Sequence, residues 1–261
     1  MKALVRWIVW AVLLAVGLQL FFIARIALMA VVAPASTAFE RSEAWHQVRD
    51  RGRLQWHQQW VPYARIADHL KRAVIASEDD SFASHDGVLW DAIEKARERN
   101  AIALERAEQQ QEKAVARAEA QARRRGTDFD PSTVPLQPVR LMGGSTITQQ
   151  LAKNLLLSSE RSLLRKGQEL VLTYALEWLL GKQRILELYL NHAEWGHGIF
   201  GAEAAAQRYF HKSAAQLTAT EAARLAVMLP NPKGADLNPY SPYLNRRTAT
   251  IAARMRYAEL P

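Results

Sequence analysis

An apolar segment near the N-terminus constrains this chain more than any other feature of its 261 residues. From Trp7 to Ala33 only Gln19 and Arg25 interrupt the apolar residues. At about 1.5 Å of rise per residue, a helix over residues 7–32 is long enough to cross a hydrocarbon core of about 30 Å. We therefore predict a transmembrane anchor over residues 7–32, followed by a folded domain.

The residues that flank the apolar run predict its orientation. Lys2 and Arg6 precede it, and short basic segments tend to stay in the cytoplasm. We expect residues 1–6 in the cytoplasm and everything after residue 32 on the outer side. Ala33-Pro34-Ala35 also resembles a signal-peptidase site, so a cleaved leader is the alternative. The apolar run exceeds the usual leader core of about 7–15 residues, which favours the anchor.

Residues 33–61 are polar and of mixed charge, and we expect them to connect the anchor to the domain. Their tryptophans, Trp45, Trp56 and Trp60, either lie at the membrane interface or belong to the core of the next domain. Residues 62–261 show mainly 3.6-residue apolar spacing without convincing period-two alternation. This pattern predicts a mostly α fold.

Helix faces and helix starts can be placed within that domain. Leu70 and Val74 share one helix face, as do a second set of apolar residues, Ile147, Leu151 and Leu155. Thr218 and Glu221 have the spacing of a capping box, which predicts a helix that begins there and runs to Leu229.

Residues 94–125 differ from their surroundings because they are rich in Ala, Glu, Gln, Arg and Lys and lack Gly and Pro. This composition favours a helix. Its apolar face is thin and mostly alanine, which predicts a solvated arm. From residue 91 to residue 125 there are 7 acids and 9 bases. Such a mixture does not suit a nucleic-acid-binding arm.

Composition excludes several classes of function. Cysteine is absent, so disulfides, zinc-thiolate sites, iron–sulfur clusters and a catalytic cysteine are excluded. Lys and Arg number 34 against 26 Asp and Glu, which gives a net charge of +8. That charge suits a nucleic acid, an anionic membrane or an anionic substrate. The mixed arm and the expected outer location disfavour nucleic acid, so we expect no nucleic-acid partner.

The motif EDDSFASHDG (78–87) follows an amphipathic helix predicted over residues 66–77. Carboxylates at that position face the negative end of the helix dipole, which costs free energy. Clustered acids also raise the pKa of at least one member. The arrangement favours a functional carboxylate such as a general base, with a solvated acidic turn as the alternative.

A second motif, GGSTITQQLAKN (143–154), places two glycines before a helix expected to be capped by Thr146 with Gln149. Backbone N–H groups at a helix start suit phosphate or pyrophosphate, although an ordinary capped helix has the same pattern. In RKGQE (165–169), Arg165 and Glu169 have the spacing of a simple helix salt bridge. The neighbours of Glu169 nevertheless predict a partly buried face. No HExxH or comparable spacing indicates a histidine metal site.

Together with KQRILELYLN (182–191) and GIFGAEAAAQRYFHK (198–212), these motifs resemble, in the same order, the family 51 glycosyltransferases. These are the peptidoglycan glycosyltransferase domains of bifunctional penicillin-binding proteins and their monofunctional biosynthetic relatives. The chain ends at Pro261 without the SxxK, SxN and KTG set of a transpeptidase, so we expect the monofunctional type. The resemblance implies a mostly α, lysozyme-like glycosyltransferase domain over residues 62–261 with one N-terminal transmembrane helix. That domain would be periplasmic, anchored in the bacterial inner membrane.

The resemblance also implies roles for individual residues. Glu78 would be the general base that deprotonates the GlcNAc 4-hydroxyl of lipid II. Glu169 would assist at the donor pyrophosphate or orient the reacting groups. The residues expected to bind substrate are Ser145, Thr146, Gln149, Gln150, Lys153, Arg161, Arg165 and Lys166. Those expected to shape the first motif are Asp79, Phe82, His85 and Gly87.

Cofactor and partners follow from the same resemblance. It allows a divalent cation, Mg²⁺ or Mn²⁺, although the sequence itself requires no cofactor and fixes no metal ligand. Expected partners are lipid II, the growing glycan chain and the membrane. The segment between Gly87 and Gly143 is longer than the family pattern because of the arm at 94–125. We expect this insertion to extend a flap beside the acceptor or to contact cell-wall synthesis or divisome proteins. A lysozyme-like peptidoglycan-cleaving enzyme and a membrane-anchored non-enzymatic scaffold are the alternatives.

Overall fold

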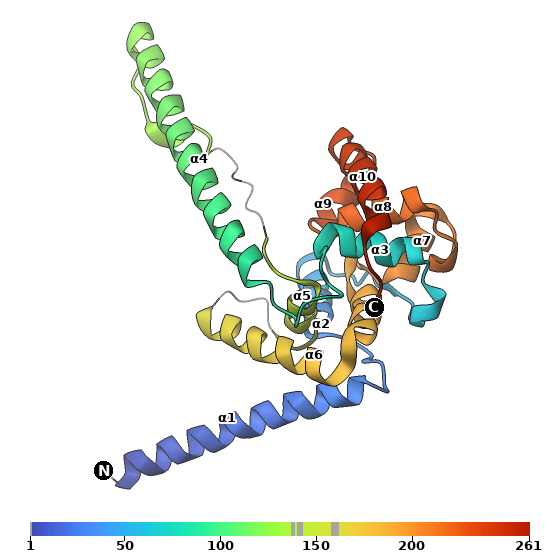
Figure 1. The fold of residues 1–261 in the computed structure, drawn as a ribbon. Helices are drawn as coiled ribbons and strands as arrows, with labels where there is room; N and C mark the ends of the chain where they lie inside the picture. The colour runs from blue at the N-terminus through green and yellow to red at the C-terminus, as the bar shows by residue number, and fades with distance from the viewer. Residues whose placement is uncertain (1, 137–138, 140–142, 158–161) are drawn as a thin grey trace. The chain divides into compact units, whose positions relative to one another are not determined.

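The computed structural model describes residues 2–136, 139, 143–157 and 162–261. Helices dominate the described chain, so the predicted mostly α fold class is confirmed (Figure 1). The chain forms two compact units. The first consists of Met1–Val88 and Thr146–Pro261, and the second of Leu89–Ser145.

The first unit contains most of the secondary structure. Its α-helices are α1 (Lys2–Met29), α2 (Ala38–Arg51), α3 (Asp68–Glu78), α5 (Ile147–Leu156), α6 (Leu163–His192), α7 (Ala202–Phe210), α8 (Ala219–Met228), α9 (Pro232–Leu237) and α10 (Pro242–Arg254). The strands are β1 (His57–Gln58), β2 (Glu194–Gly196) and β3 (Ile199–Phe200), and the short 3₁₀ turns are η1 (Tyr63–Arg65), η3 (Ala214–Gln216) and η4 (Met255–Tyr257).

Helix α1 agrees with the predicted apolar segment. It has 28 residues and a mean hydropathy of 2.3, and it is the single described helix long and apolar enough to cross a membrane. The amides of Gln19 and Gln168 donate to each other, at 2.6 and 3.0 Å, and so connect α1 to α6. At the C-terminal end of α1, Arg184 Nε donates to the carbonyl of Met29 at 2.8 Å. The anchor segment is therefore bonded to the domain at two levels.

The core of the first unit forms where α3 packs against α8 and α10 and where α5 packs against α6. Leu70 and Val74 on α3 are fully buried, as the predicted helix face requires. The apolar face of α5 is buried in the same way, through Ile147, Leu151 and Leu155. The capping box of Thr218 with Glu221 is also present, and the helix that it starts ends at Met228. The 3.6-residue pattern thus placed these faces correctly.

The predicted connector, residues 33–61, contains folded structure. Helix α2 begins with a capping box in which Thr37 and Glu40 satisfy each other's backbone N–H groups. Glu40 is fully buried and its carboxylate also accepts from His192 Nδ1 at 2.8 Å and from Gln58 at 2.9 Å. Much of this segment is thus held to the first unit by buried polar contacts, which hydropathy alone does not reveal.

The structure decides between the two alternatives for two of the three tryptophans in this segment. The Trp56 ring lies 4.6 Å from the ring of Phe200, and the Trp60 ring lies 5.8 Å from that of His192. Both therefore pack against the domain. The Trp45 side chain is 64% exposed.

A small sheet with strand order β1-β3-β2 was not predicted. Strand β1 pairs with β3 in parallel, with His57 opposite Ile199, and β2 pairs with β3 antiparallel. Gly198 precedes β3 with φ +69°, and a Cβ there would lie 2.0 Å from the carbonyl oxygen of Gln55. Only glycine permits this close approach. Strands of two or three residues are too short to show a period-two pattern.

The second unit contains one long helix, α4 (Trp90–Arg125), and a short turn, η2 (Pro131–Thr133). The helix predicted over residues 94–125 is present and begins at Trp90. None of its residues is buried, as expected for a solvated arm. Gly126 ends it in the left-handed conformation (φ +67°), and the chain then returns so that Gln111 Nε2 lies 3.5 Å from the carbonyl oxygen of Val134.

Candidate active site

Glu78 is the last residue of α3, an amphipathic helix whose buried face includes Leu70, Val74 and Ile75. Its carboxylate is partly buried and accepts from Gln150 Nε2 at 3.1 Å and from Ser77 Oγ at 3.3 Å. Burial raises the pKa of Glu78 above its ordinary value of 4.5, while the bonds from Gln150 and Ser77 act in the opposite direction. A raised pKa brings a carboxylate closer to the range in which it can accept a proton as a base.

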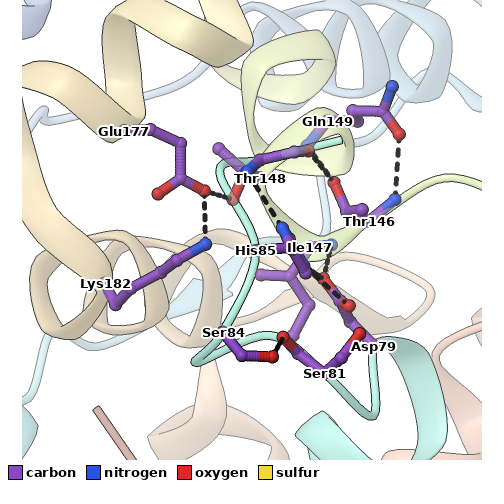
Figure 2. A network of polar contacts seen from close by, with 11 residues as sticks. Asp79, Ser81, Ser84, His85, Thr146, Ile147, Thr148, Gln149, Glu177 and Lys182 are labelled. Atoms are coloured by element: carbon purple, nitrogen blue, oxygen red, sulfur yellow. Dashed lines mark hydrogen bonds and ion pairs between the residues drawn. The ribbon is translucent and has the colours of Figure 1, made fainter. Parts of the chain in front are cut away.

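Asp79, the residue after Glu78, accepts hydrogen bonds in a separate buried network. Its carboxylate accepts from His85 Nε2 at 2.9 and 3.0 Å and from the backbone N–H of Ile147 at 3.0 Å. The Gly87 N–H donates to His85 Nδ1 at 2.9 Å. Because Nδ1 accepts, the ring proton lies on Nε2 and points to Asp79. His85 therefore links the end of the first motif to the carboxylate at its start (Figure 2).

The second motif is attached to the first through the start of α5. Thr146 and Gln149 form the predicted capping box. The Thr146 hydroxyl also donates to the carbonyl of Gly87 at 2.6 Å. The Asp79 carboxylate lies at the first N–H of this helix, where the positive end of the dipole stabilises a negative charge. The start of α5 is therefore bonded directly to the first motif.

Two residues that the sequence analysis did not single out extend this network. Glu177 Oε1 accepts from the Thr148 hydroxyl at 2.6 Å and from Lys182 Nζ at 2.7 Å (Figure 2). Lys182 also lies 4.7 Å from the ring centre of Phe82, which is fully buried. The sequence does contain one sign of a role for Glu177. It lies about two helical turns after Glu169 and therefore falls on the same face of α6.

Tyr189 is a third residue of this region that the sequence pattern did not indicate. It is only 2% exposed, and its hydroxyl donates to Gln150 Oε1 at 3.0 Å. Burial, with the charges of Glu78 and Asp79, raises the pKa of Tyr189 well above 10. Its position within an apolar helix pattern gave no sign of a polar role.

Glu169 lies on α6 and is 3% exposed. Its two carboxylate oxygens pair with Arg165 at 2.8 Å and with Lys166 at 2.5 Å. The Arg165 side chain is 17% exposed and that of Lys166 is 49% exposed. The predicted arrangement, a partly buried carboxylate beside two cations, is therefore present. These two cations are held by Glu169 itself.

The remaining predicted binding residues lie in different places. Lys153 is exposed on α5, and Ser145 is exposed in the second unit. Arg161 lies outside the described residues. The described residues contain no group of three or more His, Asp or Glu that could hold a metal ion.

Comparison with known proteins identifies the chain's relatives. A family model described as Transglycosylase matches residues 41–111 and 135–256, which leaves the outer part of the α4 arm unmatched. Similar curated proteins include the biosynthetic peptidoglycan transglycosylases of Herminiimonas arsenicoxydans (46% identical, covering 100% of this chain and 99% of that protein) and Bordetella pertussis (48% identical, covering 97% and 93%). That of Janthinobacterium sp. is 47% identical and covers 100% of this chain and 99% of that protein. The resemblance read from the five motifs is thereby confirmed, and the chain belongs to the transglycosylase family of enzymes.

Proposed function

We propose that this protein is a peptidoglycan glycosyltransferase that polymerises lipid II into glycan strands. The observation that carries the proposal is the partly buried Glu78 carboxylate, which Gln150 holds at the end of α3 and whose pKa is raised. Membership of the transglycosylase family and the names of relatives that cover nearly the whole chain support the substrate class.

In the proposed reaction Glu78 accepts the proton of the GlcNAc 4-hydroxyl of lipid II. The hydroxyl oxygen then bonds to C1 of the donor MurNAc from the face opposite the pyrophosphate. The bond between C1 and the pyrophosphate oxygen breaks with inversion, from α to β. Undecaprenyl pyrophosphate leaves with the electron pair, and protonated Glu78 returns its proton to water. The leaving group already carries negative charge, so it needs cations more than a strong acid.

We assign Glu169 an orienting role at the donor pyrophosphate. Its carboxylate holds Arg165 and Lys166 side by side on one face of α6. Lys166 is half exposed and can reach an anion in the site while Glu169 keeps its position. Lys153 on the neighbouring helix α5 is a further cation for the same group. Fixed cations stabilise a developing negative charge without reorganising during the reaction.

The proposed membrane location rests on two apolar surfaces. Helix α1 has the length and hydropathy of an anchor, with Lys2 and Arg6 at the end that we place in the cytoplasm. The first half of α6 exposes large apolar side chains, among them Leu164 at 86% and Trp178 at 82%. Exposed apolar patches of this kind mark a membrane or protein contact. We place the catalytic domain in the periplasm, at the outer face of the inner membrane.

The decisive experiment incubates the full chain in detergent with lipid II and compares it with Glu78→Gln. The unmodified protein should form polymer and release undecaprenyl pyrophosphate. Glu78→Gln should form none while its thermal unfolding is unchanged. Asp80→Asn is the matched control, because Asp80 is the adjacent exposed carboxylate, paired with Arg254. Shortened glycan from sacculi, without polymer from lipid II, would instead support a lysozyme-like hydrolase. Intact function in cells with Glu78→Gln would support a scaffold.

A further inference from the structure

A chain of two hydrogen bonds leads from the end of α6 to the carboxylate at the end of α3. The Tyr189 hydroxyl donates to Gln150 Oε1 at 3.0 Å, and Gln150 Nε2 donates to Glu78 Oε2 at 3.1 Å. Tyr189 is 2% exposed. Tyr189 on α6 and Gln150 on α5 are brought to Glu78 from two other helices, so this series of hydrogen bonds depends on the tertiary fold.

The orientation of the Gln150 amide decides whether a hydrogen-bond donor or an acceptor faces the Glu78 carboxyl group. A side-chain amide has a donating end and an accepting end, and either can face a neighbour. With its NH₂ toward Glu78, Gln150 favours the ionised carboxylate, which is the form that can act as a base. In that orientation Gln150 Oε1 needs a donor elsewhere, because a partly buried acceptor without a donor is destabilising.

Tyr189 supplies that donor. Its pKa is raised well above 10 by burial and by the charges of Glu78 and Asp79, so the phenol keeps its proton at any pH at which the enzyme would work. When Glu78 is protonated, its own O–H can donate to Gln150, and the amide can turn round. The Tyr189 hydroxyl thus stabilises the amide orientation that belongs to the ionised base.

Groups other than Gln150 also shift the pKa of Glu78. Burial raises its pKa most strongly, and the nearby Asp79 charge adds to the rise. Ser77 from α3 and Arg247 from α10 lower it, as does the bond from Gln150. Of these lowering influences, the bond from Gln150 is the one that depends on how an amide is turned.

We propose, on the basis of the function proposed above, that Tyr189 is a positioning residue that fixes the Gln150 amide and thereby keeps Glu78 ionised and correctly oriented as the base. Tyr189 touches neither substrate nor reacting atoms in this role. Its effect passes through one amide to one carboxylate.

The test is Tyr189→Phe in the full chain, with lipid II polymerisation measured across pH. Phenylalanine keeps the ring and loses only the hydroxyl. We expect kcat to fall by about tenfold, which corresponds to about 1.4 kcal/mol of barrier, and KM to change less than about twofold. Because the amide no longer favours the ionised carboxylate, the acid limb of the kcat profile should move to higher pH.

Two further variants separate positioning from simple support of the fold. Tyr209→Phe also removes hydroxyl bonds, to the Trp195 carbonyl at 2.9 Å and to Asp236 at 2.8 Å, and should leave the acid limb in place. Gln150→Leu removes the amide, and Tyr189→Phe added to it should lower kcat by no further factor. An acid limb that stays in place in Tyr189→Phe, or a loss that is fully additive with Gln150→Leu, would overturn the inference. An unmodified chain that is inactive on lipid II would instead refute the proposed function.

Discussion

Replacing Asp79 by alanine is expected to destabilise the protein far more than replacing the neighbouring Asp80. The Asp79 side chain is 0% exposed, and its carboxylate accepts from His85 Nε2 and from the Ile147 N–H. Asp80 makes one exposed ion pair with Arg254, with side chains 63% and 48% exposed. Two adjacent acids of the same motif therefore differ in burial and in the number of donors that depend on them.

The expected magnitudes follow from those contacts. Asp79→Ala leaves two buried donors without an acceptor, at about 1–3 kcal/mol each. It also removes a negative charge from the start of α5, worth about 0.3–1 kcal/mol. We expect a loss of about 3 kcal/mol or more, which lowers Tm by about 6–12 °C in a chain of this size. Asp80→Ala should cost about 0–1 kcal/mol, because exposed ion pairs contribute little.

The assay is thermal unfolding of the full chain in detergent micelles, followed by intrinsic fluorescence of its 8 tryptophans. Asp79→Asn should fall between the two alanine variants, because the amide keeps one accepting oxygen but loses the negative charge at the start of α5. If Asp79→Ala and Asp80→Ala lower Tm equally, the buried network does not hold the two motifs together, and our account of the site is wrong.

Four further results are expected. The acid limb of lipid II polymerisation should lie above pH 4.5, because the base must be ionised and the pKa of Glu78 is raised; a limb at or below 4.5 would contradict its role. Gly87→Ala should reduce the free energy of unfolding by about 2–4 kcal/mol, because φ is +86° and the new Cβ would lie 2.8 Å from Glu177 Cγ. The control, Gly126→Ala, should reduce it less, because φ is +67° there but the space around the new Cβ is open. Glu169→Gln should abolish most turnover in the polymerisation assay and lower Tm, because it leaves a mostly buried arginine without its counter-charge. Excision of residues 112–133 should leave Tm unchanged within about 2 °C, because α4 buries none of its residues. If turnover and partner recruitment were also unchanged, the arm would be neither a flap beside the acceptor nor a contact with other proteins.

Much of the fold could be predicted from local pattern. The capping boxes at Thr146 and Thr218 begin helices where the sequence indicates them, because caps depend on residues only three apart. The buried faces of α3 and α5 likewise follow from helical spacing. The helix over 94–125 follows from composition, since propensity summed over a long window is informative.

The contacts that build the site could not be predicted in this way. The bond from the Ile147 N–H to Asp79 joins residues 68 positions apart, and that from Tyr189 to Gln150 joins residues 39 apart. Neither position has a local signature, because the partner comes from another helix. Residues 33–61 were expected to be a connector for a related reason. Glu40 is polar, and only the folded chain shows that it is buried against His192.

The paired amides of Gln19 and Gln168 set the depth at which the catalytic domain sits, if α1 spans the bilayer as proposed. Gln19 is one of two polar residues that interrupt the apolar run, and its partner Gln168 directly precedes Glu169. An amide pair is difficult to separate in lipid, where no water can replace either partner. The anchor would thus hold Arg165 and Lys166, which pair with Glu169, at a constant position relative to the bilayer.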